Sequence, residues 1–254
     1  MTGAQTRRTA LTALVGLALL AGASLARAAD VNVAVAANFT DPAKEIAAAF
    51  SARTGEHVVL SFGSSGQFYT QITQGAPFEV FLSADADRPK RLESEGQAVP
   101  GTRFTYAIGQ LALYSRTPGL VDDHGAVLSR GGFDKISIAD PTAAPYGVAA
   151  IQTMTRLGVY SRLQSKIVKG SSITQAFQFV TSGAAELGFV ALAQVIGEPG
   201  GSRWQVPANL HAPIDQQAVL LFKGDKDPAA RAFLAFLKSR KALAIIRKYG
   251  YEAP

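Results

Sequence analysis

Short hydrophobic blocks alternate with amphipathic segments along the first part of the chain. The blocks have the length of strands and are rich in Val, Phe, Leu and Ala, whereas the segments between them carry apolar residues at helical spacing. In chain order they predict a strand at 31–37, a helix at 41–55, a strand at 57–62, a helix at 67–75, a strand at 78–84 and a helix at 85–96. This alternation is typical of a parallel sheet covered by helices.

The same alternation begins again after an extended segment at 106–115. It predicts a strand at 135–141, a helix at 146–159, a strand at 165–170, a helix at 172–183 and a strand at 186–192. A loop-rich region, 198–215, leads to a strand at 216–222 and to amphipathic helices within 227–250. The pattern therefore predicts an α/β protein with two similar lobes.

One short unit occurs in both halves. A shift of 107 positions without a gap places the Gly-Ser-Ser sequence of 63–65 on that of 170–172, Glu79 on Glu186, and Ala84 on Ala191. In each half the unit is a strand, a Gly-Ser-Ser turn and a helix. Two copies so far apart do not fit a solenoid, whose repeats are much shorter, so we interpret them as matching parts of the two lobes.

The extended segments near 106–115 and 214–222 are the natural places for the chain to cross between lobes. We therefore expect lobe I to comprise 29–108 and 216–254, and lobe II to comprise 109–215. Each lobe would be a mostly parallel sheet flanked by helices, with a cleft between the lobes.

The N-terminus has the pattern of a signal peptide. Arg7 and Arg8 precede an apolar run, which ends in Ala26-Arg27-Ala28, and this order matches a basic region, a hydrophobic region and a cleavage site. An uncleaved membrane anchor is less favoured because the run is shorter than the ~20 residues that a span needs. We expect residues 1–28 to be removed and the protein to be exported to the periplasm.

Export changes the meaning of the charge. The whole chain has a net charge of +6, but residues 1–28 contain three Arg and no acidic residue, so the mature chain carries only +3. A charge this small gives no reason to expect a nucleic-acid partner. The absence of Cys excludes disulfides, thiolate metal sites and a Cys nucleophile.

The two Gly-Ser-Ser turns carry the candidate chemistry. Each places hydroxyl groups at a helix N-terminus, where unpaired N–H groups and the positive end of the helix dipole favour an anion. Ligands of open α/β sheets bind beyond the carboxyl ends of the strands, so both turns would face the cleft. The alternative for either turn alone is that Ser only caps its helix.

Enzymatic function is not expected. The sequence contains no G-x-S-x-G, H-E-x-x-H, Walker or dinucleotide-binding motif. His57, His124 and His211 lack the spacing of metal ligands, and helix capping explains Asp85 and Asp87 as well as an acid/base pair does. A periplasmic hydrolase is the alternative from another functional class.

Five segments resemble the periplasmic molybdate-binding proteins of ABC importers. They are VAVAANFTDPAKEIAAAF, SFGSSG, GAPFEVFLSAD, ADPTAAPYG and ELGFVALAQ, and the similarity extends over nearly the whole mature chain. The resemblance implies a two-lobe, type II periplasmic-binding fold. It also implies a monomer without a cofactor that closes on molybdate or tungstate and delivers it to a membrane ABC permease.

The resemblance also implies the ligand contacts. They are Asn38 after the first strand, Ser65 in the first turn, Tyr146 between Pro and Gly in lobe II, and the backbone at Ile173. All four would contact the oxygens of the oxyanion, with no direct ligation of the metal. Because that anion accepts hydrogen bonds only, hydroxyl, amide and backbone N–H donors suit it.

The chain departs from the commonest family pattern at two positions. Many members have Ser where this chain has Asn38, and a Tyr donor where it has Ala191. We interpret Tyr146 as a relocated phenol donor. The alternatives are that Tyr146 only packs against its lobe and that Asn38 only caps the helix beginning near Asp41. The alternative function is binding of sulfate, phosphate or another small anion by the same fold.

Overall fold

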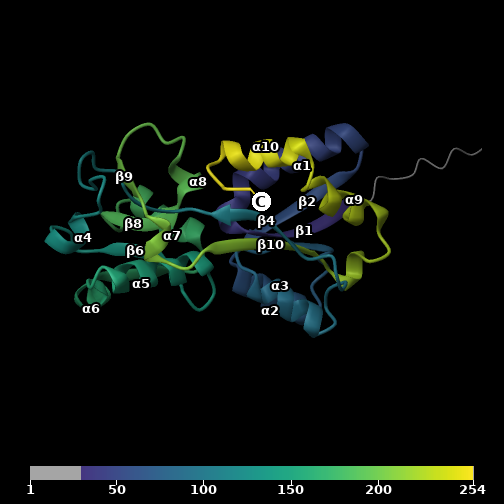
Figure 1. Ribbon diagram of the computed structural model, residues 1–254, viewed down its shortest axis with the longest axis horizontal. Helices are drawn as coiled ribbons and strands as arrows, with labels where there is room; N and C mark the ends of the chain where they lie inside the picture. Colours follow the sequence, from purple (N-terminus) through teal and green to yellow (C-terminus); the bar gives the residue numbers. More distant parts are fainter. Residues whose placement is uncertain (1–29, 254) are drawn as a thin grey trace, which may run out of the picture.

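The structure, a computed structural model that describes residues 30–253, contains two five-stranded sheets. The predicted signal peptide, residues 1–28, lies outside the described residues. The first sheet has the strand order β2 (His57–Gly63), β1 (Asp30–Ala36), β3 (Val80–Leu82), β10 (Ile214–Leu220) and β4 (Phe104–Gly109). The second has the order β7 (Ile167–Gly170), β6 (Ile136–Ala139), β8 (Leu187–Ala191), β5 (Leu111–Ser115) and β9 (Ser202–Gln205). Figure 1 shows the resulting lobes, lobe I on the first sheet and lobe II on the second, side by side along the long axis.

The two sheets share one topology. In each, a central strand pairs in parallel with two neighbours: β1 with β2 and β3, and β6 with β7 and β8. The fourth strand of each sheet, β10 or β5, runs antiparallel to both of its neighbours. The sheets are thus mixed around a parallel half, and the predicted two-lobe α/β fold is confirmed.

Helices cover both faces of each sheet, as Figure 1 shows. Lobe I carries η1 (Ala37–Phe39), α1 (Thr40–Thr54), α2 (Ser65–Thr73), α3 (Asp87–Ser94), η4 (Phe222–Gly224), α9 (Pro228–Phe236) and α10 (Arg240–Lys248). Lobe II carries α4 (Val127–Arg130), α5 (Pro145–Arg156), α6 (Tyr160–Leu163), η2 (Gln164–Lys166), α7 (Ile173–Thr181), α8 (Leu192–Val195) and η3 (Ala208–Leu210). Within residues 30–253, no helix combines the length and the apolar character needed to cross a membrane.

Each sheet has a hydrophobic core on both faces. In lobe I, side chains of α1, α9 and α10, such as Phe50 and Phe233, pack on one face, and those of α2 and α3, such as Phe68 and Leu92, pack on the other. The main core of lobe II continues across the junction, because it includes Ala84 of lobe I. The two lobes are therefore packed against each other.

The chain crosses between the lobes twice, at places that the sequence located only in part. The extended segment 106–115 is two strands in different sheets, separated by Gln110 alone. The return crossing lies between the end of β9 and the start of β10, before Ile214 and not within 214–222. Pro207 and Pro213 lie in it, and because proline lacks a backbone donor, neither continues a strand ladder.

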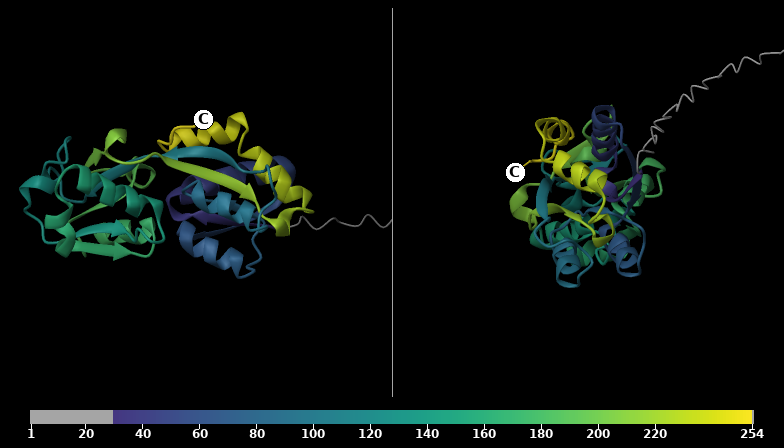
Figure 2. Two further views of the ribbon diagram at one scale, coloured as in Figure 1. Left: turned by 60° about the horizontal axis from the view of Figure 1, so that its bottom comes forward. Right: turned by 90° about the vertical axis from the view of Figure 1, so that its right-hand side faces the viewer.

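Figure 2 shows β4 and β10, the strands of lobe I at these crossings, side by side, in agreement with their antiparallel pairing. The exact boundaries expected from the sequence, 29–108 and 216–254 for lobe I and 109–215 for lobe II, stay a prediction.

Candidate functional site

A small cavity at the junction of the lobes brings the four candidate residues Asn38, Ser65, Tyr146 and Ile173 together. All four are at most 3% exposed. The complete lining is Ala36, Ala37, Asn38, Ser64, Ser65, Ala84, Ala144, Pro145, Tyr146 and Ile173. Its volume is about 10 Å³, which is room for about one water molecule.

The fold explains why these residues meet. Asn38 lies in η1, directly after β1, and Ser65 is the first residue of α2, which follows β2. In lobe II, Tyr146 is the second residue of α5, after β6, and Ile173 is the first residue of α7, after β7. All four therefore follow the carboxyl ends of parallel strands, the edge at which α/β sheets bind ligands.

The N-terminus of α2 offers two donors from one residue. Ser64 caps the helix, because its Oγ accepts from the N–H of Gln67 at 3.3 Å. Ser65 is the first helical residue, so the helix supplies no acceptor for its N–H. The Ser65 Oγ accepts from the N–H of Ala84 at 2.9 Å, which leaves the hydroxyl proton for another acceptor.

The N-terminus of α7 is built in the same way, but one residue later in its turn. Ser172 caps α7 by accepting from the N–H of Gln175 at 3.2 Å, so Ile173 holds the first helical position. The structural counterpart of Ser65 is thus Ile173. The gapless alignment, which placed Ser65 on Ser172, is wrong by one residue at this point.

The alignment holds again at the start of the next strand. Glu79 and Glu186 directly precede β3 and β8. The Glu79 carboxylate accepts from the N–H of Asn32, and the Glu186 carboxylate accepts from the N–H groups of Asp134 and Lys135. Compared with lobe I, lobe II therefore has one extra residue between its strand and its helix, and one residue fewer between that helix and the glutamate.

Asn38 is held in a buried polar network. Its Nδ2 donates to Gln216 Oε1 at 2.8 Å and to the Tyr251 hydroxyl at 3.1 Å. The Tyr251 hydroxyl donates in turn to the backbone carbonyl of Asn38 at 2.6 Å. Asn38 does not cap α1, whose cap position is Phe39 and has no side-chain hydrogen bond. Both amide hydrogens of Asn38 thus point to neighbouring side chains.

Tyr146 keeps its phenol proton at neutral pH. Its hydroxyl accepts from Gln216 Nε2 at 3.4 Å. Burial raises the pKa of the Tyr146 hydroxyl well above its usual value, and the hydroxyls of Tyr251 and Tyr106 raise it further, Tyr251 also through a hydrogen bond with Tyr146. The phenol therefore stays protonated at neutral pH and remains a donor.

The sequence did not identify three members of this network, Tyr106, Gln216 and Tyr251. The Tyr106 hydroxyl donates to Gln216 Oε1 at 3.0 Å, and the Tyr106 and Tyr251 rings pack edge-on against Phe39. Gln216 is one of two adjacent Gln residues at the start of the predicted strand 216–222, and nothing in that pattern distinguishes it from Gln217. No local pattern connects Tyr251, near the C-terminus, with this site.

Besides the bond from Gln216 to Tyr146, three hydrogen bonds cross the junction around the cavity. The N–H of Gly66 donates to the carbonyl of Ala143 at 2.9 Å, and Arg88 donates to the carbonyl of Thr142 at 3.2 Å. On the other side, Thr174 Oγ1 donates to the carbonyl of Ala37 at 3.4 Å. The structure is therefore a closed arrangement of the two lobes.

The chemistry of the lining favours an anion that accepts hydrogen bonds and carries no proton. No charged residue is among the ten that line the cavity. The first turns of α2 and α7 direct N–H groups into it, and Ser65 and Tyr146 add hydroxyl protons. Among the described residues, no three His, Cys, Asp or Glu side chains gather to hold a metal ion.

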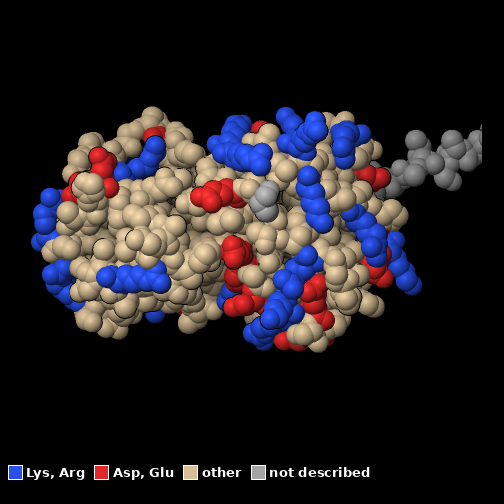
Figure 3. All heavy atoms as spheres, viewed as in Figure 1, with Lys and Arg blue, Asp and Glu red and all other residues tan. Residues whose placement is uncertain are grey.

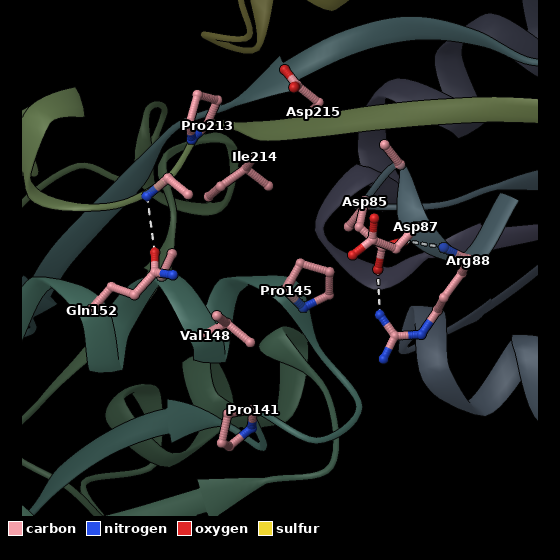
Figure 4. A pocket seen from close by; sticks show the side chains of 14 residues that line it. Asp85, Asp87, Arg88, Pro141, Pro145, Val148, Gln152, Pro213, Ile214 and Asp215 are labelled. Carbon is pink, nitrogen blue, oxygen red and sulfur yellow. Dashed lines mark hydrogen bonds and ion pairs between the residues drawn. The ribbon is translucent and has the colours of Figure 1, made fainter. Parts of the chain in front are cut away.

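A larger pocket of about 390 Å³ also lies between the lobes. Figure 4 shows that Asp85, Asp87 and Asp215 line it, with Arg88 paired to Asp85. Figure 3 shows acidic side chains near the junction and basic ones over α1 and α10. Carboxylates repel an anion, so the small neutral cavity, and not this pocket, is the candidate anion site.

The chain is similar in sequence and in fold to known solute-binding proteins. Residues 31–252 match the family described as bacterial extracellular solute-binding protein. The chain is 59% identical over 243 residues to the molybdate-binding protein ModA of Rhodobacter capsulatus, covering 96% of this chain and 94% of the relative. It is 54% identical over 244 residues to ModA of Azotobacter vinelandii, covering 95% and 96%. The solved periplasmic molybdate-binding protein of Azotobacter vinelandii superimposes with a TM-score of 0.85 at 46% identity, covering 88% of this chain and 99% of that one.

Proposed function

Because the chain belongs to the family of bacterial extracellular solute-binding proteins, we propose that it captures molybdate or tungstate in the cavity between its lobes. Two relatives that carry the name molybdate-binding protein match nearly its whole length. The observation that carries the proposal is the buried cavity without charged residues, at which two helix N-termini and the hydroxyls of Ser65 and Tyr146 meet.

In this proposal the oxyanion oxygens accept hydrogen bonds from both lobes at once. Lobe I offers the hydroxyl and N–H of Ser65, and lobe II offers the phenol of Tyr146 and the N–H of Ile173. Asn38 lines the same cavity and orients the network behind it. An anion bound on both sides favours the closed state, because the closed state alone lets all of these donors reach it.

The lack of a Lys or Arg in the lining suits a carrier. Neutral donors stabilise a dianion through hydrogen bonds without a full opposite charge, so the ion can be released again. We propose that the protein works as a monomer in the periplasm, needs no cofactor, and delivers the anion to a membrane ABC permease. We propose no catalytic role for it.

Sulfate and phosphate are the alternative ligands. Phosphate retains a proton at neutral pH and would need an acceptor, and no carboxylate is among the lining residues. Sulfate has the same charge and the same acceptors as molybdate but is smaller, so size is the property that must separate the two. Molybdate is favoured over sulfate by the two relatives that carry the name molybdate-binding protein.

Calorimetry of the purified mature protein tests the proposal. We expect one site per chain for molybdate and for tungstate, and far weaker binding of sulfate and phosphate. Ligand at about 1,000 times its dissociation constant should add roughly 4 kcal/mol to the free energy of unfolding. Equal affinity for sulfate and molybdate would overturn the assignment in favour of a general oxyanion carrier.

A further inference from the structure

Gln216 is a fully buried polar residue in the middle of a strand. It lies in β10, where the pairing with β4 shifts register between Gln216 and Gln217. Such a shift redirects side chains relative to a regular ladder. A buried side-chain amide is stable only when its hydrogen-bonding groups are satisfied, so the partners of Gln216 indicate what it does.

Those partners come from both lobes. Gln216 Oε1 accepts from Asn38 Nδ2 at 2.8 Å and from the Tyr106 hydroxyl at 3.0 Å, both in lobe I. Gln216 Nε2 donates to the Tyr146 hydroxyl of lobe II at 3.4 Å. One amide thus has its acceptor end toward one lobe and its donor end toward the other.

We infer that Gln216 is a positioning residue that turns the phenol proton of Tyr146 toward the bound anion. Asn38 Nδ2 fixes the amide with its oxygen facing lobe I, and the Tyr106 hydroxyl, whose one proton is shared between this oxygen and the carbonyl of Ser83 at 3.2 Å, supports it. The NH₂ group of Gln216 then faces Tyr146. The Tyr146 oxygen then acts as the acceptor in that bond, so its proton goes to another acceptor: the neighbouring Tyr251 hydroxyl, with which it shares a hydrogen bond, or an anion in the cavity. The inference rests on the proposed function, since it gives the phenol its ligand.

The surroundings restrict this arrangement further. Gly109, the last residue of β4 before the crossing, lies against both groups: a Cβ there would collide with the Tyr146 hydroxyl and come within 2.7 Å of Gln216 Nε2. The network therefore lies where the chain passes between the lobes. The direction of the phenol and the closure of the lobes depend on the same few atoms.

The side chains hydrogen-bonded to Gln216 are neutral. The titratable ones are Tyr106 from β4, Tyr146 from α5 and Tyr251 of the C-terminal segment, which also bonds Asn38. Burial raises the pKa of each of the three tyrosines. The nearest carboxylates that act on this network are Asp85, toward Tyr106, and Asp41, toward Tyr251.

A Gln216→Glu variant tests the inference through its pH dependence. A protonated carboxyl has the shape of the amide and can still donate to Tyr146, whereas a carboxylate only accepts and draws the phenol proton away from the ligand. Burial and the two nearby carboxylates raise the pKa of the introduced group. If only the protonated form is competent, the dissociation constant for molybdate rises about tenfold per pH unit above that pKa.

The measurement is calorimetry with molybdate between about pH 6.5 and 9. This range ends about one pH unit below the ordinary tyrosine pKa of about 10, so no tyrosine of the network titrates within it. The wild type should be flat over this range, because its network has no group that titrates there. The matched control is Gln217→Glu, next on the strand, where Arg103 Nη1 lies 2.6 Å from the side-chain oxygen and would pair with the carboxylate. We expect this control to bind molybdate as the wild type does, at every pH.

A double-mutant cycle keeps the test open if Gln216→Glu does not fold. Gln216→Met removes the hydrogen bonds but keeps the bulk, and it should weaken binding about ten- to a hundredfold. In a Tyr146→Phe background the same change should have little further effect. Additive losses in the cycle, or a Gln216→Glu profile as flat as that of the wild type, would overturn the inference. Failure of the wild type and of Gln217→Glu to bind molybdate would instead overturn the proposed function.

Discussion

The first turns of α2 and α7 have similar sequences but differ in which residue begins the helix. Both follow a strand that ends in Gly, and both are capped by Ser, yet the first helical residue is Ser65 in lobe I and Ile173 in lobe II. Lobe I thus offers a hydroxyl and an N–H from one residue. Lobe II offers only the N–H at that position, and its hydroxyl comes from Tyr146 on another helix.

This difference separates two roles of Ser in the same tripeptide. A cap Ser directs its oxygen back to its own helix, as Ser64 and Ser172 do, and such an oxygen is occupied. A Ser in the first helical position directs its hydroxyl away from the helix. The position relative to the helix start, and not the Gly-Ser-Ser motif, decides which hydroxyl can reach a ligand.

Ser65→Asp should have the largest effect. A carboxylate at this buried position would face a dianion at short range, in surroundings with few screening groups. We expect no measurable binding of molybdate by calorimetry. Ser161→Asp, on the exposed surface of α6, is the control for an added charge and should bind normally. Normal affinity in Ser65→Asp would place the anion elsewhere.

Tyr146→Phe tests the hydroxyl on the side of lobe II. The ring keeps its packing and only the donor is lost, so the dissociation constant should rise by about ten- to a hundredfold, or roughly 1.5 to 3 kcal/mol. Tyr69→Phe is the matched control, because its hydroxyl bonds Glu95 on the surface. An unchanged dissociation constant in Tyr146→Phe would leave lobe II with backbone donors alone.

Gly66→Ala tests whether closure itself matters. A Cβ at this position would lie 2.9 Å from Ala143 Cα and 3.0 Å from its carbonyl oxygen, across the junction. The lobes would have to move apart, so we expect affinity to fall by about tenfold, together with a more open shape in small-angle scattering. Gly197→Ala, which meets nothing within 4 Å, should change neither property. A variant as compact and as tight-binding as the wild type would contradict this role.

The two cap residues should show the smallest effect on binding. Ser64→Ala and Ser172→Ala each remove a cap, which should lower the free energy of unfolding by about 1 kcal/mol and leave affinity nearly unchanged. Ser65→Ala should do the reverse, since it weakens binding and removes no cap. Chemical denaturation and calorimetry on the three variants measure both quantities. A loss of affinity in Ser172→Ala as large as that in Ser65→Ala would contradict the one-residue offset.

The periodicity of the sequence predicted the alternation of strands and helices, the two lobes, and the edge of each sheet at which the candidate residues gather. It predicted these because hydrophobic pattern and turn chemistry are local. The offset between the turns was not predictable, because two adjacent Ser residues are both acceptable caps and only the backbone path chooses between them. The split at Gln110 was hidden for a similar reason, since two strands with one residue between them read as one.

The hydrogen-bond network behind the cavity could not be predicted from the sequence for a different reason. Asn38 contacts Gln216 and Tyr251, which are 178 and 213 residues away along the chain. Contacts at such separations leave no trace in the local pattern. Only the folded arrangement shows that the amide of Asn38 is directed into this network.

The position of a bound anion tests the account most directly. Anomalous diffraction from crystals grown with tungstate locates the tungsten atom without any assumption about its contacts. We expect one site per chain, in the cavity between Ser65 and Tyr146, with oxygens within hydrogen-bonding distance of both hydroxyls and of the Ile173 N–H. A tungsten atom in the larger pocket beside Asp85 and Asp215, or outside the junction of the lobes, would contradict the account.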